Sequence, residues 1–289
     1  MIRLVFLGVG GGAPSHWGLP GILAFKEGLS ILFDCGEGTQ QRIMEKALGI
    51  NVKVVAITHM HGDHVLGLPG MIQTMGLLGR KEELIVLGPG ELRDFLEETF
   101  RRTKFEPDFP ITFADKFETK EFSLRPFETC HTIESRGYVL EETERRNLDA
   151  DRLRAEGVKE FWVFRALKEG KTVEYKGRVL KPEDYVMVSK GKKVVYTGDT
   201  RPCNRVIEAS KDADLLIHDS TFDYNEEAHS YGHSNAGEAG EIAAKANVRT
   251  LALYHYSARY STTEPLLAEA RRKFPRVVAP EPFDSIFIR

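Results

Sequence analysis

The chain is poor in cysteine, has no long apolar run and has no excess of basic residues, and each absence narrows what it can be. Only Cys35, Cys130 and Cys203 occur among its 289 residues. Because their number is odd and they lie far apart, we expect no disulfide framework and a reducing environment. No apolar run reaches the roughly 20 residues of a transmembrane helix, and residues 1–4 enter a strand-like pattern without signal-peptide organisation. We therefore expect a cytoplasmic protein that does not attach to a membrane.

Basic and acidic residues are nearly balanced. The chain carries 40 Lys and Arg against 43 Asp and Glu, a formal net charge of -3 at pH 7. This balance argues against a generally basic surface, so a nucleic-acid substrate would need a local positive patch. The length suffices for one large or two small domains with an ample core. The sequence shows no fixed-period repeat, and strand-like stretches alternating with helical ones in both halves favour two facing layers. The runs at 21–26 and 29–33 predict a hairpin around Glu27 and Gly28, and helices are predicted at 40–48 and 266–274.

What the chain does have is a dense cluster of metal-ligand residues behind an apolar run. The β-branched run at 52–57 predicts a buried strand, and Thr-His-Met-His-Gly-Asp-His follows it, with His59, His61, Asp63 and His64. In extended geometry the first two histidines point the same way. The aspartate and the third histidine come after a glycine turn and can face a second point nearby. Two such sets of nitrogen and oxygen ligands are what a pair of Zn²⁺-like ions needs. The simpler alternative is a polar loop with solvated histidines.

Three further candidates follow strand-like runs. Asp199 comes after a buried run and a glycine, a position from which one carboxylate can bridge two cations, although an Asx turn is an alternative. Asp34 ends the predicted strand 29–33 and either accepts hydrogen bonds from the histidine loop or caps the next turn. His131 follows the predicted strand 122–127, and a single histidine is weak evidence by itself.

The remaining candidate histidines lie in the last third of the chain. His218 belongs to a predicted buried strand and is expected to make core or supporting contacts. His233 precedes the predicted helix 236–246, where a histidine is often a cap or a surface residue. His255, the last histidine, follows the predicted strand 248–253.

Two segments are ambiguous. The glycine-rich stretch 8–15 does not fit a dinucleotide fingerprint and is either a bare turn or a flexible loop whose backbone approaches a phosphate or a nucleic-acid end. Residues 141–181 are densely charged and sparse in apolar residues apart from those at 161–164. This segment is either a solvated excursion or a protruding arm that grips an anionic polymer, with basic side chains on phosphates and aromatic ones for stacking.

Taken in chain order, the motifs resemble the metallo-β-lactamase superfamily and, within it, the short form of tRNase Z (ribonuclease Z), of an archaeal type. The segments that carry the resemblance are the glycine-rich loop, FDCGEGTQ (33–40), THMHGDH (58–64), YTGDT (196–200), HDST (218–221), GHS (232–234) and YHYSARY (254–260). The resemblance implies an α/β fold, α+β in some schemes. That fold is a four-layer αββα sandwich of residues 1–289 as a single domain, with residues 141–181 inserted as a protruding exosite-like arm.

The resemblance also implies a site with two Zn²⁺ ions per subunit, for which Mn²⁺ or Fe²⁺ could substitute. The implied ligands are His59, His61 and His131 for the first ion, Asp63, His64 and His255 for the second, and Asp199 between them. Asp63 would also take the proton of the attacking water, and His233 would stabilise charge on the phosphate or protonate the leaving oxygen. The residues implied to support the ligands from behind are Asp34, His218 and Asp219.

The implied activity is that of a zinc-dependent endoribonuclease, a hydrolase that removes the 3′ trailer from precursor tRNA. Attack by a metal-bridging hydroxide would leave a 3′-hydroxyl tRNA and a 5′-phosphorylated trailer. The implied partners are precursor tRNA and a second copy of the chain, whose arm serves the other subunit's site, whereas neither DNA nor a membrane is expected. The candidate tRNA contacts are Ser15, Lys159, Arg165, Lys168 and Lys171.

Some positions depart from the family pattern. Residues 159–162 (KEFW) replace the Gly-Pro element of the arm, residues 15–18 (SHWG) stand where many members carry Lys and Arg, and Asn235 stands where Thr is usual. These departures concern the gripping of tRNA and its 3′ terminus rather than the metal chemistry. Three other hypotheses compete: a hydrolase of small phosphodiesters or sulfate esters, a redox or thiol-ester enzyme of the same fold, and a non-catalytic RNA-binding module.

Overall fold

The computed structural model describes residues 1–224 and 227–289, and strand pairing joins much of the chain into two seven-stranded sheets. The chain divides into two units, the first made of Met1–Glu141 and Lys192–Arg289 and the second of Glu142–Gly191. Both large sheets belong to the first unit. No helix in the described ranges is long and apolar enough to cross a membrane. The three cysteines are free thiols.

The first sheet has an antiparallel half and a parallel half. Its strands lie in the order β20-β1-β3-β4-β5-β6-β7, antiparallel as far as β4 and parallel from there on. Their bounds are β1 Ile2–Gly8, β3 Gly21–Lys26, β4 Leu29–Phe33, β5 Val54–Ala56, β6 Leu84–Leu87, β7 Ile111–Phe113 and β20 Ser285–Ile288. Glu27 and Gly28 between β3 and β4 both have positive φ, 49° and 77°. Positive φ at both central residues is the signature of a two-residue type I′ turn, which matches the hairpin that the sequence predicts.

The second sheet repeats this plan. Its order is β19-β17-β16-β15-β10-β9-β8, and β15, β16, β17 and β19 are parallel to one another. The bounds are β8 Phe117–Glu118, β9 Phe122–Glu128, β10 Arg136–Glu142, β15 Lys193–Tyr196, β16 Leu215–Asp219, β17 Leu251–Tyr254 and β19 Val277–Val278. A short parallel pair, β2 (Gly10–Gly11) with β18 (Tyr256–Ser257), links the segment after β1 to the segment after β17.

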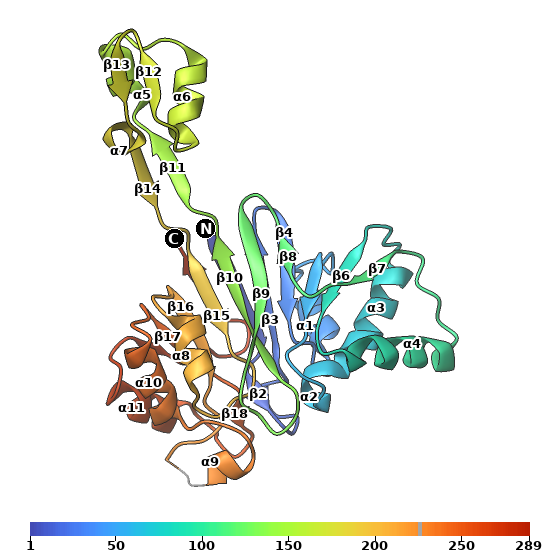
Figure 1. Cartoon of the computed structure of the whole chain (residues 1–289). Coiled ribbons are helices and arrows are strands. Elements are labelled where there is room, and N and C mark those ends of the chain that lie inside the picture. The colour runs from blue at the N-terminus through green and yellow to red at the C-terminus, as the bar shows by residue number, and fades with distance from the viewer. Residues whose placement is uncertain (225–226) are drawn as a thin grey trace. The chain divides into compact units, whose positions relative to one another are not determined.

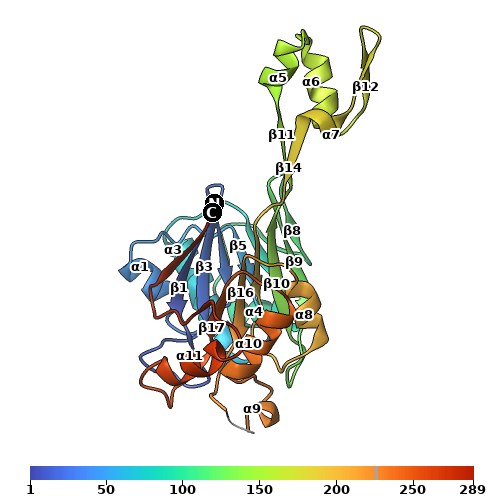
Figure 2. The ribbon, with the colours of Figure 1, turned by 90° about the vertical axis from the view of Figure 1, so that its left-hand side faces the viewer.

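Helices cover the outer faces of the two sheets (Figures 1 and 2). Those on the first sheet are α1 (Thr39–Glu45), α3 (Gly67–Leu77) and α4 (Glu91–Thr103), with the single turn α2 (Gly62–Val65) before α3. Those on the second are α8 (Asn204–Ser210), α10 (Ala236–Lys245) and α11 (Glu264–Arg271), and α9 (Glu227–Ser230) precedes α10. The predicted αββα sandwich is confirmed.

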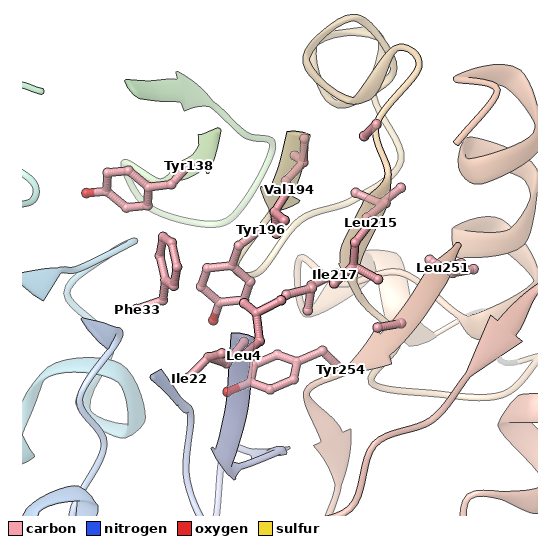
Figure 3. Packing of buried hydrophobic residues seen from close by; sticks show 14 of the residues in the cluster. Leu4, Ile22, Phe33, Tyr138, Val194, Tyr196, Leu215, Ile217, Leu251 and Tyr254 are labelled. Atoms are coloured by element: carbon pink, nitrogen blue, oxygen red, sulfur yellow. The ribbon is translucent and has the colours of Figure 1, made fainter. Parts of the chain in front are cut away.

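The alternation of side chains along each strand builds two cores. Leu4, Ile22 and Phe33 point from the first sheet toward the second and meet Tyr196 and Tyr254 there (Figure 3). The Phe33 and Tyr196 rings pack edge to face, with centroids 5.6 Å apart. The neighbouring residues of the same strands point the other way and pack under α1, α3 and α4. Each such side chain contributes about 1.5–3 kcal/mol when fully buried, so the sandwich is a firm support for what lies at its edge.

The second unit has its own small core. An antiparallel ladder of β11 (Arg145–Leu148) and β14 (Val186–Ser189) leads to α5 (Ala150–Ala155), α6 (Phe161–Lys168), the hairpin β12 (Val173–Tyr175) and β13 (Arg178–Leu180), and α7 (Pro182–Tyr185). Leu153, Val163 and Leu167 are fully buried among these elements. The unit ends at Gly191 rather than at the predicted residue 181, because β14 pairs with β11.

Several predicted elements end earlier or begin later in the structure. The helix predicted at 40–48 ends at Glu45, since Ala47 adopts a φ of 50° outside the helical region. The helix predicted at 266–274 spans Glu264–Arg271. The strands predicted at 52–57 and 248–253 shorten to β5 and β17.

Candidate metal centre

The histidine loop leaves the first sheet at β5 and enters α2. Residues 57–61 are irregular, with His61 in an extended conformation (φ -63°, ψ 145°) at the N-cap of α2. His59 and His61 therefore lie on a loop beyond the predicted strand, and Asp63 and His64 lie in the single helical turn. This turn points the later pair at a different place from the earlier pair.

The first group of ligand-type side chains comes from three segments. Its members are His59, His61, His131 and Asp199, with ligand atoms all within 4.8 Å of one another. Nε2 of His59 lies 3.0 Å from Nδ1 of His61, which lies 3.1 Å from Nε2 of His131. His131 reaches this place from the loop between β9 and β10.

The second group lies next to the first. Nε2 of His64 is 3.2 Å from Nε2 of His255, and Oδ2 of Asp63 is 3.3 Å from that same His255 nitrogen. His255 directly follows β17 and has a φ of 66°, which turns its side chain back toward the histidine loop.

Asp199 faces both groups. Its Oδ1 atom lies 3.3 Å from Nε2 of His64 and 3.3 Å from Nε2 of His255, and its Oδ2 atom lies 3.6 Å from Nε2 of His59. The side chain is buried, and Oδ1 has no hydrogen-bond partner among the described residues. A buried carboxylate oxygen without a hydrogen bond is costly unless a cation compensates it.

The spacing of these atoms fits divalent cations. Two nitrogens that each lie about 2.1 Å from one tetrahedral ion are about 3.4 Å apart. The nitrogens within each group are 3.0–3.2 Å apart and converge. Lone pairs that converge in this way repel one another unless a proton or a metal ion lies between them. The two groups, joined by Asp199, therefore fit a divalent-metal cofactor.

Neighbouring groups hold the outward nitrogen of three of these histidines. Nδ1 of His64 contacts Asp34, Nδ1 of His131 contacts the carbonyl oxygen of Gly232 at 2.8 Å, and Nδ1 of His255 contacts the Thr221 hydroxyl at 2.9 Å. Such contacts fix the tautomer and the ring orientation of metal-binding histidines. Sequence reasoning missed Gly232 and Thr221 in this capacity. The type of a residue does not reveal what its carbonyl oxygen contacts, and in the sequence Thr221 is recognisable only as the last residue of the HDST motif (218–221).

The charge states of the buried groups suit ligation. Burial lowers the pKa of His59, of His61 and of His131, so these imidazoles are neutral near pH 7. Burial by itself would raise the pKa of Asp199, but His255 and His64 hold it well below its usual range. Ligands must be deprotonated to bind a metal, and these groups are.

His64 and Asp63 form a more polarised pair. Burial would lower the pKa of His64, but Asp199 and Asp34 prevail and raise it well above its ordinary value. Burial would raise the pKa of Asp63, yet the neighbouring His64 and His255 hold it below its usual range. A cation at Nε2 of His64 would take the place of the proton that these carboxylates favour.

His233 lies beside the second group, and a ligand-type atom of its ring lies within 4.8 Å of those of Asp199 and His255. Its Nδ1 is 2.9 Å from Oδ2 of Asp219, and its ring stacks on His255 with centroids 5.1 Å apart. Burial would lower the pKa of His233, but the Asp219 carboxylate prevails and raises it to about 9. The imidazolium form is therefore present near neutral pH at the edge of the cluster.

The remaining candidates lie elsewhere. His218 is buried in β16 with Nδ1 2.7 Å from the carbonyl oxygen of Asp219, and it does not belong to either ligand group. Ser15 lies in the glycine-rich loop, where its hydroxyl accepts a hydrogen bond from Trp17 N at 3.3 Å. Asn235 caps α10, with its side chain accepting from Glu238 N at 2.8 Å, so asparagine serves this helix start well.

The four basic candidates at 159–171 belong to the second unit. Arg165 and Lys171 both pair with Glu169, at 2.9 and 2.8 Å. Lys168 and Arg165 line a hollow of about 720 Å³ together with Phe161. Lys159 is exposed at the turn before α6.

The chain is similar to known proteins over its whole length. Residues 22–278 match the model of the metallo-β-lactamase superfamily. A protein of Sulfurisphaera tokodaii named ribonuclease Z is 54% identical over 290 residues, which cover 100% of this chain and 99% of that one. The ribonuclease Z of Metallosphaera sedula is also 54% identical, over 100% of both chains. The crystal structure of human tRNase Z, short form, has a TM-score of 0.72 at 24% identity and covers 99% of both chains.

Proposed function

Because this chain belongs to the ribonuclease Z family of the metallo-β-lactamase superfamily, we propose that it is a metal-dependent endoribonuclease that removes the 3′ trailer from precursor tRNA. The observation that carries the proposal is the pair of ligand groups that share Asp199. Two adjacent cation sites promote the hydrolysis of a phosphodiester, because they stabilise the charge on both the attacking and the leaving oxygen. We propose that the protein encounters this substrate in the cytoplasm.

We propose that the two ions are Zn²⁺. The first would be held by the three histidines of the first group, the second by Asp63, His64 and His255, and Asp199 would lie between them. A ligand set rich in imidazole suits zinc, and Mn²⁺ or Fe²⁺ could occupy it in its place. When bound, such ions lower the pKa of a coordinated water to about 7 and neutralise charge on the phosphate oxygens.

The chain's own residues then handle the protons. Asp63 is ionised and lies at the second group, so its carboxylate can accept a proton from the attacking water. The water oxygen forms a bond to phosphorus, and the bond between phosphorus and the 3′ oxygen of the tRNA breaks. His233, held protonated by Asp219, can donate a proton to that leaving oxygen. The products are a 3′-hydroxyl tRNA and a trailer with a 5′ phosphate.

The second unit is proposed to bind the body of the tRNA as the exosite-like arm. Its hollow brings Arg146, Arg165 and Lys168 together with the rings of Phe161 and Phe164. Guanidinium and ammonium groups bind phosphates, and exposed rings stack on bases. Because Arg165 and Lys171 both pair with Glu169, we expect Lys168 to contribute more to the affinity for tRNA than either of them. We also propose a homodimer in which each arm serves the partner's site.

A cleavage assay tests the proposed function. Zinc-loaded protein is incubated with a 3′-extended tRNA precursor beside an Asp63→Ala control, and both new ends are mapped. We expect cleavage near the discriminator base, a 3′-hydroxyl on the tRNA, a 5′ phosphate on the trailer, and loss of cleavage in the control. An intact precursor together with rapid hydrolysis of a small phosphodiester would instead support the alternative, a small-phosphodiester hydrolase.

A further inference from the structure

The glycine-rich loop after β1 runs alongside the second ligand group. Its strand β2 pairs in parallel with β18, with Gly10 opposite Tyr256 and Gly11 opposite Ser257. Tyr256 N donates to the carbonyl oxygen of Val9 at 2.9 Å. Because β18 begins at the residue after His255, this pairing fixes the loop against the backbone of a candidate ligand.

Gly11 lies directly against the imidazole of His255. A Cβ atom built on Gly11 would lie 2.0 Å from both Cε1 and Nε2 of that ring and 2.3 Å from Nδ1. These distances are far below van der Waals contact, so any side chain at Gly11 requires the ring to move. The ring has little room to do so, since it stacks on His64 and on His233 with centroids 5.1 Å away in each case.

Gly12 contacts the other ligand of the same group. Its backbone N–H donates to Oδ2 of Asp63 at 2.7 Å. This is the same oxygen that lies 3.3 Å from Nε2 of His255 and 3.6 Å from Nε2 of His64. A short hydrogen bond from a fixed amide to a carboxylate determines which oxygen faces the ligand group. The φ of Gly12 is 74°, a value that favours glycine at this place.

We infer that Gly11 and Gly12 are positioning residues for the second cation and not for the first. Gly11 sets the position of the His255 ring, and the Gly12 amide aims the Asp63 carboxylate. Among the contacts described for these two glycines, those to ligand-type side chains go to His255 and Asp63. The inference rests on the proposed function to the extent that it takes Asp63, His64 and His255 as a cation site.

Metal counting on the full chain tests the inference without any RNA. The apo proteins, wild type and Gly11→Ala, are titrated with Zn²⁺ against a chelating dye, and bound zinc is counted by mass spectrometry. Loss of a group that orients a ligand typically lowers metal affinity by about 10- to 100-fold. We expect that loss for one of the two ions in Gly11→Ala, with the other ion bound as in the wild type. Gly90→Ala is the matched control, because its added methyl group meets open space.

A double-mutant cycle separates positioning from general damage to the fold. In a His255→Ala background the ring is absent, so Gly11→Ala should cause no further change in zinc affinity. An equal loss of both ions, or a further loss in the His255→Ala background, would overturn the inference. The inference would also be overturned if the wild-type protein bound only one ion. If zinc binding behaves as expected but precursor tRNA stays intact, the inference stands and the proposed function fails.

Discussion

Oδ2 of Asp34 lies 2.8 Å from Nδ1 of His64, and both side chains are fully buried. The same carboxylate accepts hydrogen bonds from Thr58 N at 2.7 Å and from the Tyr196 hydroxyl at 2.6 Å. Asp34 itself has a φ of 53° at the end of β4. One side chain thus joins the histidine loop to the facing sheet. Because Nδ1 of His64 is held, its Nε2 is left to face Asp199.

Asp34→Ala is expected to destabilise the protein strongly. The change leaves the Thr58 amide, the Tyr196 hydroxyl and Nδ1 of His64 without their acceptor inside the sandwich. Breaking a buried charged pair by removing one partner costs about 3–5 kcal/mol of unfolding free energy. Urea unfolding of the apo protein measures it. Asp34→Asn is the matched control and should lose less, since asparagine tolerates positive φ and keeps one acceptor oxygen. An unchanged urea midpoint in Asp34→Ala would contradict the supporting role.

Asp199→Ala is expected to weaken both metal sites at once. Its two oxygens face the two groups, so on our proposal the change removes a shared ligand and not only an orienting contact. We expect fewer than two bound ions per chain and a fall in kcat/KM of at least about 10²- to 10³-fold. His131→Ala serves as the comparison, because its ring lies in the first group alone. If Asp199→Ala lowered the occupancy of one ion only, the proposal that Asp199 serves both ion sites would be wrong.

Sequence patterns predicted the strands and their hairpins better than the loops that carry the site. The hairpin of β3 and β4 has the predicted bounds because its turn residues and apolar runs agree. The helical turn α2 was not foreseen, since four residues at 62–65 are too few to show a helical period. The place of His131 in the first group was implied by the family resemblance, because a lone histidine after a strand predicts little.

The second unit shows a different limit. Its sequence is dense in charge, and the apolar residues of its core are scattered through several short elements. Leu153, Val163 and Leu167 become a core only when α5, α6 and the hairpin of β12 and β13 come together. Contacts of that kind are tertiary and have no local signature. The ladder of β11 and β14, which sets the end of the unit, pairs residues about 40 apart in sequence for the same reason.

The raised pKa of His233 predicts an alkaline limit for cleavage. Asp219 raises this pKa to about 9, so the proton that we propose His233 donates is present at neutral pH and is lost as the pH rises through about 9. The pH profile of kcat, measured on precursor tRNA, should fall on that side. In Asp219→Asn the midpoint of this alkaline fall in kcat should move down toward about 6.5, the ordinary pKa of histidine. An unchanged midpoint would show that the fall does not come from His233.

The same contact predicts how stability depends on pH. A group whose folded pKa lies above its unfolded value stabilises the folded state fully below the unfolded value, here about 6.5, and the contribution disappears as the pH passes the folded value, here about 9. His233→Gln should therefore cost stability at pH 6 and cost less at pH 9.5. Thermal unfolding of the apo protein at the two pH values tests this, and an equal cost at both would contradict it.

Lys168→Ala is expected to weaken the binding of precursor tRNA without altering the chemistry. Lys168 lines the hollow of the second unit with Phe161, whose side chain is 77% exposed, whereas the ligand groups belong to the first unit. KM for precursor tRNA should rise while hydrolysis of a small phosphodiester stays as in the wild type. If the side chain contacts one phosphate, the slope of log affinity against log salt should fall by about 1. Lys181→Ala is the matched control, an exposed lysine of the same unit that does not line the hollow. If the two changes weakened tRNA binding equally, the unit would act through its overall charge. If neither change had an effect, RNA would not bind at this hollow.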